Sequence, residues 1–290
     1  MINLLKICII TFLGTVILYK NNYTSDWSDL NNLPDLEPES WIPGVHTLSI
    51  HIRDTSTHDS VYQFFHNKLK LPVYYFPIQI GQRKYAGLYA GNMALEPCGP
   101  YSDIDYADNK FRSIFYGLNL EVSESLQAIE QILCDRNIKQ QVNKGSIYIR
   151  DSNLTDENIF IGLYEIPDKD KRDSLASLLI ADTINSPGIE YIKEISIGYK
   201  MEMNLLEWKK LLDPLKIEKK GTCRINDSLQ LYFIKGDINE VKSITFKVSS
   251  IRKTEKYFLE NDLTGFASDH TISLDSTKTF DLAIYFTDAE

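Results

Sequence analysis

Four segments of the chain share one alternation of hydrophobic and polar residues. Each begins with apolar side chains at every second position, as in a strand, and continues with apolar residues at helical spacing. The strand patterns begin at His46, Tyr116, Lys193 and Lys242 and read "HTLSIHIRD", "YGLNLEVSE", "KEISIGYK" and "KSITFKVSS". Short apolar strands follow each helical pattern. The sequence therefore predicts four copies of one unit, a strand, a helix and two or three further strands.

Each helical pattern has a single apolar stripe. The stripe of the second pattern consists of Leu126, Ile129, Ile132 and Leu133. Such a stripe must lie across one face of a sheet, and the other face is left open. Two units placed side by side can curl their sheets into an open trough. We therefore expect an α+β fold in which four βαββ(β) modules pair into two open troughs.

The boundaries of these pairs follow from the spacing of the units. We expect a first two-module domain over residues 44–167 and a second over residues 189–290. Residues 168–188 have a charged start, a short helical pattern and a Ser-Pro-Gly end, which favours a linker.

The first 20 residues have a different pattern, with one early lysine and then an apolar run from Ile7 to Tyr19. The run is short for a membrane span, which needs roughly 20 residues, and it suits the apolar region of a secretory signal. It predicts a signal peptide or signal anchor, and therefore an exported or membrane-anchored protein. A buried helix in a cytoplasmic protein is the alternative. Residues 21–43 are polar and contain prolines, so they are the expected linker.

Composition narrows the functional classes. The chain has 290 residues and a formal net charge of −9, and such a surplus of acid argues against a general nucleic-acid binder. Its four cysteines show no CxxC spacing, and they fit neither a disulfide framework nor a zinc site. The sequence also contains no phosphate-binding loop, nucleophile elbow, dinucleotide fingerprint or HExxH string. A small-molecule ligand is the partner that we expect.

The stretch from His46 to Pro97 resembles the vicinal oxygen chelate family. This family includes glyoxalase I, extradiol dioxygenases, fosfomycin-resistance enzymes and bleomycin-binding proteins. "HTLSIHIRD" and "VYQFFHNKLKLPVYY" look like the family's opening strand, helix and following turn, and "YAGLYAGNMALEP" looks like its closing hairpin. The family's usual glycine after the helix is replaced by Lys70. The resemblance covers residues 44–290 and weakens after Asp168.

The resemblance implies a divalent metal ion in a trough. In the family, each first strand supplies one ligand, usually His, and each last strand supplies one, usually Glu. The metal chelates two adjacent oxygens of a substrate and acts as a Lewis acid. Aligned on the endings "MALEP" and "LYEIP", the two carboxylate positions fall on Glu96 and Glu165. These two acids are therefore the predicted catalytic and metal-binding carboxylates.

The histidine positions of the family fall on Thr47 and Gly117, and strand parity indicates which histidine could substitute. Side chains alternate between the two faces of a strand, which directs His51 into the trough. His46 has the opposite parity and would reach the trough only if the strand is bulged. The prediction is a reduced metal site of Glu96, Glu165 and His51, with His46 as the substitute. The alternative makes the two acids ordinary strand-end residues.

Three functions fit these features. The first is a glyoxalase-type lyase or isomerase that binds or transforms a small oxygenated metabolite through the metal. The second is a non-catalytic small-molecule binding protein of the bleomycin-resistance type, with an aromatic trough that includes Tyr74, Tyr75, Phe76, Tyr85 and Tyr89. The third is a ring-cleaving dioxygenase, which is weakened because the second half lacks two histidines and a glutamate.

The second trough has Phe233 and Phe286 at the carboxylate positions, so it offers no metal-ligand set. We expect this half to support the first, to bind an apolar ligand or to form a homodimer contact.

Overall fold

The computed structural model describes residues 40–100, 112–155, 158–165, 169–181 and 185–289. The predicted export segment, residues 1–20, and the predicted linker as far as residue 39 lie outside these ranges. Among the described residues, no helix is both long enough and apolar enough to span a membrane.

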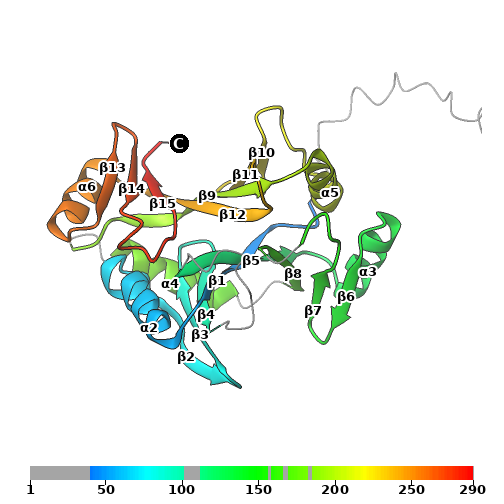
Figure 1. Ribbon diagram of the computed structural model, residues 1–290, viewed down its shortest axis with the longest axis horizontal. Helices are drawn as coiled ribbons and strands as arrows, with labels where there is room; N and C mark the ends of the chain where they lie inside the picture. The colour runs from blue at the N-terminus through cyan, green and yellow to red at the C-terminus, as the bar shows by residue number, and fades with distance from the viewer. Residues whose placement is uncertain (1–39, 101–111, 156–157, 166–168, 182–184, 290) are drawn as a thin grey trace, which may run out of the picture. The chain divides into compact units, whose positions relative to one another are not determined.

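The predicted units appear as four strand–helix pairs (Figure 1). These pairs are β1 (Gly44–Ile52) with α2 (Thr55–Gln63), β5 (Ser113–Val122) with α3 (Leu126–Asp135), β9 (Ile189–Tyr199) with α5 (Glu202–Leu212), and β12 (Glu240–Val248) with α6 (Ile251–Glu260). Helix α2 continues into a short π-helix, η2 (Phe64–Lys68). All four helices follow the strand that the alternation of the sequence predicts.

The strands form one sheet of eight and one sheet of seven. The first sheet has the order β2 (Val73–Ile80), β3 (Arg83–Tyr89), β4 (Ala94–Gly99), β1, β5, β8 (Phe160–Glu165), β7 (Ser146–Ile149) and β6 (Gln140–Asn143). The second has the order β10 (Thr222–Arg224), β11 (Gln230–Lys235), β9, β12, β15 (Ile284–Thr287), β14 (Thr271–Leu274) and β13 (Thr264–Ala267).

The pairing within both sheets repeats the same plan. The opening strands of two units lie antiparallel at the centre, as β1 with β5 and β9 with β12. The closing strand of each unit lies parallel beside its own opening strand. The predicted α+β fold, with four modules paired into two sheets, is confirmed.

The core side of the first sheet follows the predicted parity. Leu48, Ile50 and Ile52 of β1 are fully buried, and so is Leu118 of β5. On helix α3, Ile129 and Leu133 of the predicted stripe are buried. The helices therefore cover one face of the sheet, and the opposite face remains for a site.

The segments expected to be linkers contain packed residues. Trp41 and Ile42, assigned to the linker 21–43, are buried, and the indole of Trp41 donates a 2.7 Å hydrogen bond to the carbonyl of Asp213. Their large apolar side chains gain stability from burial, so the folded body includes them. The segment 168–188 contains helix α4 (Lys169–Ala181), whose Leu175 and Leu179 are buried.

Candidate functional site

A cavity of about 410 Å³ lies on the open face of the first sheet. We call it the first-sheet cavity. Its lining comes from β1, β3 and β4 of the first unit and from β5, β7 and β8 of the second. The lining residues are Ser49, His51, Arg83, Tyr85, Glu96, Cys98, Tyr116, Gly117, Asn119, Tyr148, Phe160 and Tyr164. The two units therefore build it together, as the sequence predicts for the first trough.

Glu96 is the carboxyl group of this cavity. It stands on β4 in register with Ser49 of β1. The hydroxyl of Tyr75 donates a 2.6 Å hydrogen bond to one carboxylate oxygen, and the hydroxyl of Ser49 lies 3.5 Å from the other. Burial raises the pKa of Glu96, while the hydrogen bonds from Tyr75 and Ser49 act in the opposite direction. The group is therefore desolvated but fixed in position.

Asn119 provides an unused acceptor beside this acid. Its amide nitrogen lies 3.4 Å from the Ser49 hydroxyl, to which it donates. Its Oδ1 is buried and, among the described residues, accepts no hydrogen bond. A buried acceptor that lacks a partner costs free energy, so a rotation of the amide that lets a ligand donate to this oxygen would add to affinity.

Three glycines make room for these polar side chains. A Cβ at Gly162 would lie 2.7 Å from Oδ1 of Asn119, and one at Gly117 would lie 2.9 Å from the Ser49 hydroxyl. A Cβ at Gly87 would lie 2.4 Å from carbons of the Tyr75 ring. The floor of the cavity therefore depends on residues that carry no side chain.

Aromatic rings form the wall of the cavity. The ring of His51 stacks on Tyr116, with centroids 3.6 Å apart, and Tyr116 is nearly parallel to Phe160, at an angle of 11°. Tyr148 meets Phe160 edge to face, with centroids 5.0 Å apart. Burial, and then the charge of Arg83, lowers the pKa of His51 to about 3, so its imidazole is neutral at physiological pH.

His46 also reaches the open face, because β1 is bulged at this residue. The pairing of β1 with β5 shifts its register between Val45 and Thr47. The ring of His46 consequently lies near Tyr74 and Tyr164, with centroid distances of 6.3 and 6.1 Å. Burial, and then the charge of Arg172, lowers the pKa of His46 to about 4. The bulge on which the substitute role of His46 depends is present.

The two histidines are nevertheless too far apart to share one ion. His46 and His51 are five residues apart on one strand, which corresponds to about 16 Å at about 3.3 Å per residue. The pair therefore contributes one ligand at most to any single site.

Glu165 lies on the other face of the sheet, and the prediction that it points into the trough with Glu96 is wrong. It pairs with Val122, whose side chain is in the core, and its own side chain is exposed. Its carboxylate accepts a 3.3 Å hydrogen bond from the backbone N–H of Leu126, at the start of α3. An acid at a helix N-terminus stabilises the helix. The neighbouring residue, Tyr164, lines the cavity instead.

The predicted ligand set does not fit a divalent metal ion. Of its four members, only His51 and Glu96 line the first-sheet cavity. Across the described residues, no three His, Cys, Asp or Glu side chains form a group that could hold a metal. Firm binding requires at least three protein ligands, so we assign no chemistry through a metal here.

Helix α4 lies beside the His46 end of the open face. The guanidinium of Arg172 forms an ion pair with buried Glu121 of β5 and donates a 2.8 Å hydrogen bond to the carbonyl of Asn92. The ammonium of Lys171 lies 4.4 Å from the centroid of the Tyr74 ring. The α4 segment therefore helps to position the strands on which the cavity is built.

Several cavity residues were not identified from the sequence. Tyr148, Phe160 and Tyr164 lie on β7 and β8, and the alternation in "SIYI" and "FIGLYE" could have placed them on the open face. Tyr116 has the parity of the core and reaches the cavity because a second register shift lies opposite it in β1, between Ser49 and Ile50. Bulges of this kind leave no clear signal in one sequence.

Comparison with known proteins gives structural matches only. No protein-family model matches the chain, and no curated protein sequence does. The manganese(II)-bound glyoxalase from Novosphingobium aromaticivorans is 8% identical, with a TM-score of 0.56 over 87% of this chain and 84% of that one. A mutant of 4-hydroxymandelate synthase from Streptomyces coelicolor is 10% identical, with a TM-score of 0.55, and the match covers 84% of this chain and 92% of that one. A catechol 2,3-dioxygenase is 10% identical, with a TM-score of 0.55, and the match covers 86% of this chain and 88% of that one.

Proposed function

We propose that this chain, whose fold is that of the vicinal oxygen chelate proteins, binds a small oxygenated molecule with a planar ring in the first-sheet cavity. The fold expected from the sequence resemblance is confirmed, but identities of this size carry no activity with them. One observation supports the proposal most directly. The half-buried carboxyl of Glu96 and Asn119, whose Oδ1 has no hydrogen-bond partner among the described residues, line one cavity with an aromatic wall.

Each part of the cavity matches one part of such a ligand. A planar ring can stack against Tyr116 and Phe160, and aromatic contacts of this kind add about 0.5–1.5 kcal/mol beyond burial. Hydroxyl groups on the ring can donate to Asn119 and Glu96. Arg83 supplies a cation for an acidic substituent. A volume of about 410 Å³ is in the range of small-molecule sites.

The names of the structural neighbours suggest a probe. One neighbour is named for catechol, a planar ring with two adjacent hydroxyls. Its hydroxyls can donate to Glu96 and Asn119, two polar residues whose side chains both contact the Ser49 hydroxyl. Because the predicted metal ligands are not brought together, the proposal for this chain is binding of such a ring and not its cleavage.

The experiment is titration of the full chain with catechol by calorimetry, in wild type and two variants. Asn119→Leu removes the acceptor, and Glu96→Gln replaces the carboxylate. We expect each to weaken catechol binding at least tenfold, because a lost hydrogen bond to a buried or charged group is worth about 1.5–3 kcal/mol and each 1.4 kcal/mol is about tenfold in affinity. Asn67→Leu and Glu124→Gln make the same chemical changes at exposed positions. Absence of catechol binding, or equal weakening in these controls, would refute the proposal.

Proton transfer on the bound ligand is a second candidate, supported by the raised pKa of Glu96. A desolvated carboxyl in a cavity is suited to general acid–base catalysis. Glu96 would take a proton from a carbon next to a carbonyl and return it to the adjacent atom, as an isomerase requires. Hydrogen–deuterium exchange at the carbons of dihydroxyacetone, followed by NMR, tests this reaction. Glu96→Gln should abolish any enzyme-dependent exchange, and wild type without exchange would exclude it for this probe.

A further inference from the structure

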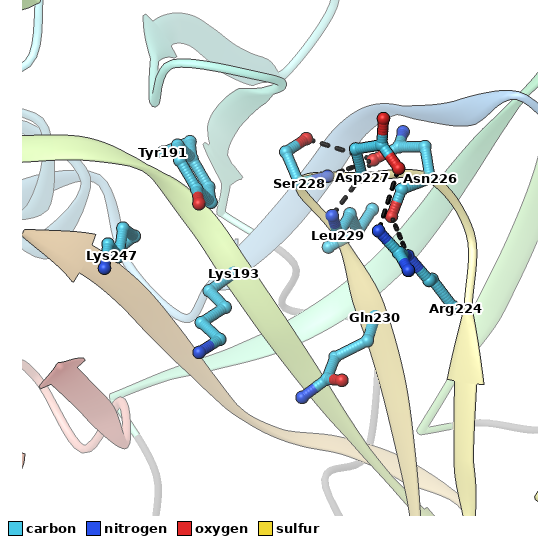
Figure 2. Close-up of a pocket in the computed structure, with 9 residues that line it drawn as sticks. All are labelled: Tyr191, Lys193, Arg224, Asn226, Asp227, Ser228, Leu229, Gln230 and Lys247. Carbon is cyan, nitrogen blue, oxygen red and sulfur yellow. Dashed lines mark hydrogen bonds and ion pairs between the residues drawn. The ribbon is translucent and has the colours of Figure 1, made fainter. Parts of the chain in front are cut away.

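A larger cavity, of about 580 Å³, lies on the second sheet (Figure 2). We call it the second-sheet cavity. Strands β9, β10, β11 and β12 and the turn between β10 and β11 form it. It continues into a neighbouring cavity of about 440 Å³, with which it shares Lys193 and Gln230. In the part of the chain that the structure describes, it has no lining residue in common with the first-sheet cavity.

Positive charge gathers in this cavity. Lys193, Lys247 and Arg224 line it from three different strands. Among the described residues, the one acid that lines it is Asp227, which is fully exposed and pairs with Arg224 at 2.8 Å. The whole protein carries a formal charge of −9, so a cationic cavity stands out against the rest of the surface. A cleft lined by one sign of charge concentrates ligands of the opposite sign.

The two lysines already hold their ammonium groups against oxygen atoms. Lys193 donates to the carbonyl of Ala289 at 2.7 Å, and Lys247 lies 3.3 Å from the same oxygen. Lys247 also donates to the carbonyl of Asp288 at 2.7 Å. A shared acceptor places the two ammonium groups next to each other. An anion in the same place would add a Coulomb attraction to both ammonium groups that a neutral carbonyl does not provide.

Neutral groups complete the lining. Figure 2 shows Lys193 between Lys247 and Gln230, with the ring of Tyr191 near both lysines. Tyr191 is also the strand neighbour of Lys247 in the pairing of β12 with β9. The nearby acid Glu194 lines the adjoining cavity, where its carboxylate accepts a 2.9 Å hydrogen bond from the Gln230 amide. The Glu194 carboxylate therefore lies against the Gln230 amide.

We propose that the second-sheet cavity binds a small dianion that carries carboxylate or phosphate groups. Lys193 and Lys247 bind one anionic group. Arg224 binds the other at the opposite side of the cavity. This site is independent of the proposed function of the first-sheet cavity, because the two use different residues on different sheets. It also replaces the expectation of an apolar ligand for this half, since basic and polar side chains dominate the lining.

The test is calorimetric titration of the full chain with succinate and, separately, with inorganic phosphate. We expect the double variant Lys193→Met, Lys247→Met to weaken binding at least tenfold, and Arg224→Gln to weaken the binding of succinate more than that of phosphate. Lys235→Met is the matched control. It removes one lysine charge from the same sheet, at an exposed residue whose ammonium lies 3.4 Å from Glu202.

The two probes separate the sources of the anionic group, because one carries only carboxylates and the other only phosphate. The proposal fails if wild type binds neither probe, or if Lys235→Met weakens binding as much as the double variant does. Arg224→Gln keeps the test decisive if the double variant does not fold, since the Arg224 side chain is 70% exposed and its loss should not unfold the protein.

Discussion

The hydroxyl of Tyr75 lies 2.6 Å from a carboxylate oxygen of Glu96, and this hydrogen bond crosses the first sheet. Tyr75 stands on β2 and Glu96 on β4, with β3 between them. The ring can pass over β3 because Gly87, its strand neighbour, has no side chain. A tyrosine on the edge strand therefore fixes the carboxyl group in the cavity.

Gly87→Ala should disturb this arrangement. The new methyl group would lie 2.4 Å from the Tyr75 ring, which must move and release Glu96. Strain of this kind typically costs about 1–3 kcal/mol, so we expect urea unfolding at a lower midpoint and weaker catechol binding. Gly236→Ala is the control, because the nearest atoms there belong to the flexible end of Lys242. An unchanged Gly87→Ala protein would contradict the proposed role of this glycine.

Glu96→Gln should change how stability depends on pH. The folded protein raises the pKa of Glu96 above the ordinary value of 4.5, so in this range it binds the proton more tightly than the unfolded chain. The contribution of Glu96 to the free energy of unfolding therefore falls as pH rises from 4.5 to the folded pKa. The stability of Glu96→Gln relative to wild type should increase over this window, by at most about 1.4 kcal/mol per pH unit. Urea unfolding across pH values measures it, and a constant difference would contradict it.

The two histidines of β1 should make stability fall as pH decreases, whereas Glu96 makes it fall as pH rises. The folded pKa values of His51 and His46 are about 3 and about 4, below the ordinary 6.5. The unfolded chain therefore binds these protons first, and stability falls as pH decreases from 6.5. Each histidine contributes a loss of at most about 1.4 kcal/mol per pH unit. His51→Gln should unfold with a shallower acid dependence than wild type, and His270→Gln, at an exposed position, is the control for replacing a histidine.

Arg172→Met should destabilise the protein strongly. It leaves the buried carboxylate of Glu121 without its ion-pair partner, and breaking such a pair costs about 3–5 kcal/mol. The double variant Arg172→Met, Glu121→Gln should recover much of this loss, because no buried charge then remains. Chemical denaturation measures both, with Arg252→Met as the exposed control. If the double variant is as unstable as the single one, the buried charge is not the cause.

The reduced metal site predicted from the sequence can be tested directly. We expect elemental analysis of the protein purified without chelators to find no stoichiometric divalent metal, and EDTA to leave Tm unchanged. Glu165→Gln should weaken only the N-terminus of α3, by about 0.3–1 kcal/mol. A stoichiometric metal that is lost in His51→Gln would restore the sequence-based prediction.

The alternation of the sequence was sufficient for the fold and for part of the site. It placed Leu48, Ile50 and Ile52 in the core and directed His51 into the cavity, because both follow from the period of a regular strand. Glu96 was also placed correctly. These residues lie where β1 and β4 pair without a shift.

The sequence predicted the wrong sheet face for residues where the position along the chain does not determine which face a side chain occupies. Matching the endings "MALEP" and "LYEIP" set Glu165 one position away from the residue that faces the cavity, and a slip of one residue reverses the face of a strand. His46 and Tyr116 lie at bulges, which change the face without any distinctive residue type. The contacts of Arg83 and Arg172 join strands and helices distant in sequence, so no local pattern could reveal them.

The side-chain amide of Asn92, in the first half of the chain, takes the place of a strand neighbour for Ile192 in the second. Its nitrogen donates to the carbonyl of Ile192 at 2.8 Å, and its oxygen accepts from the N–H of Ile192 at 3.1 Å. An amide side chain can do this because it carries both a donor and an acceptor. A side chain without an amide at position 92 would leave these two backbone groups of Ile192 without this partner, so the two halves, although built on one plan, are not interchangeable at this residue.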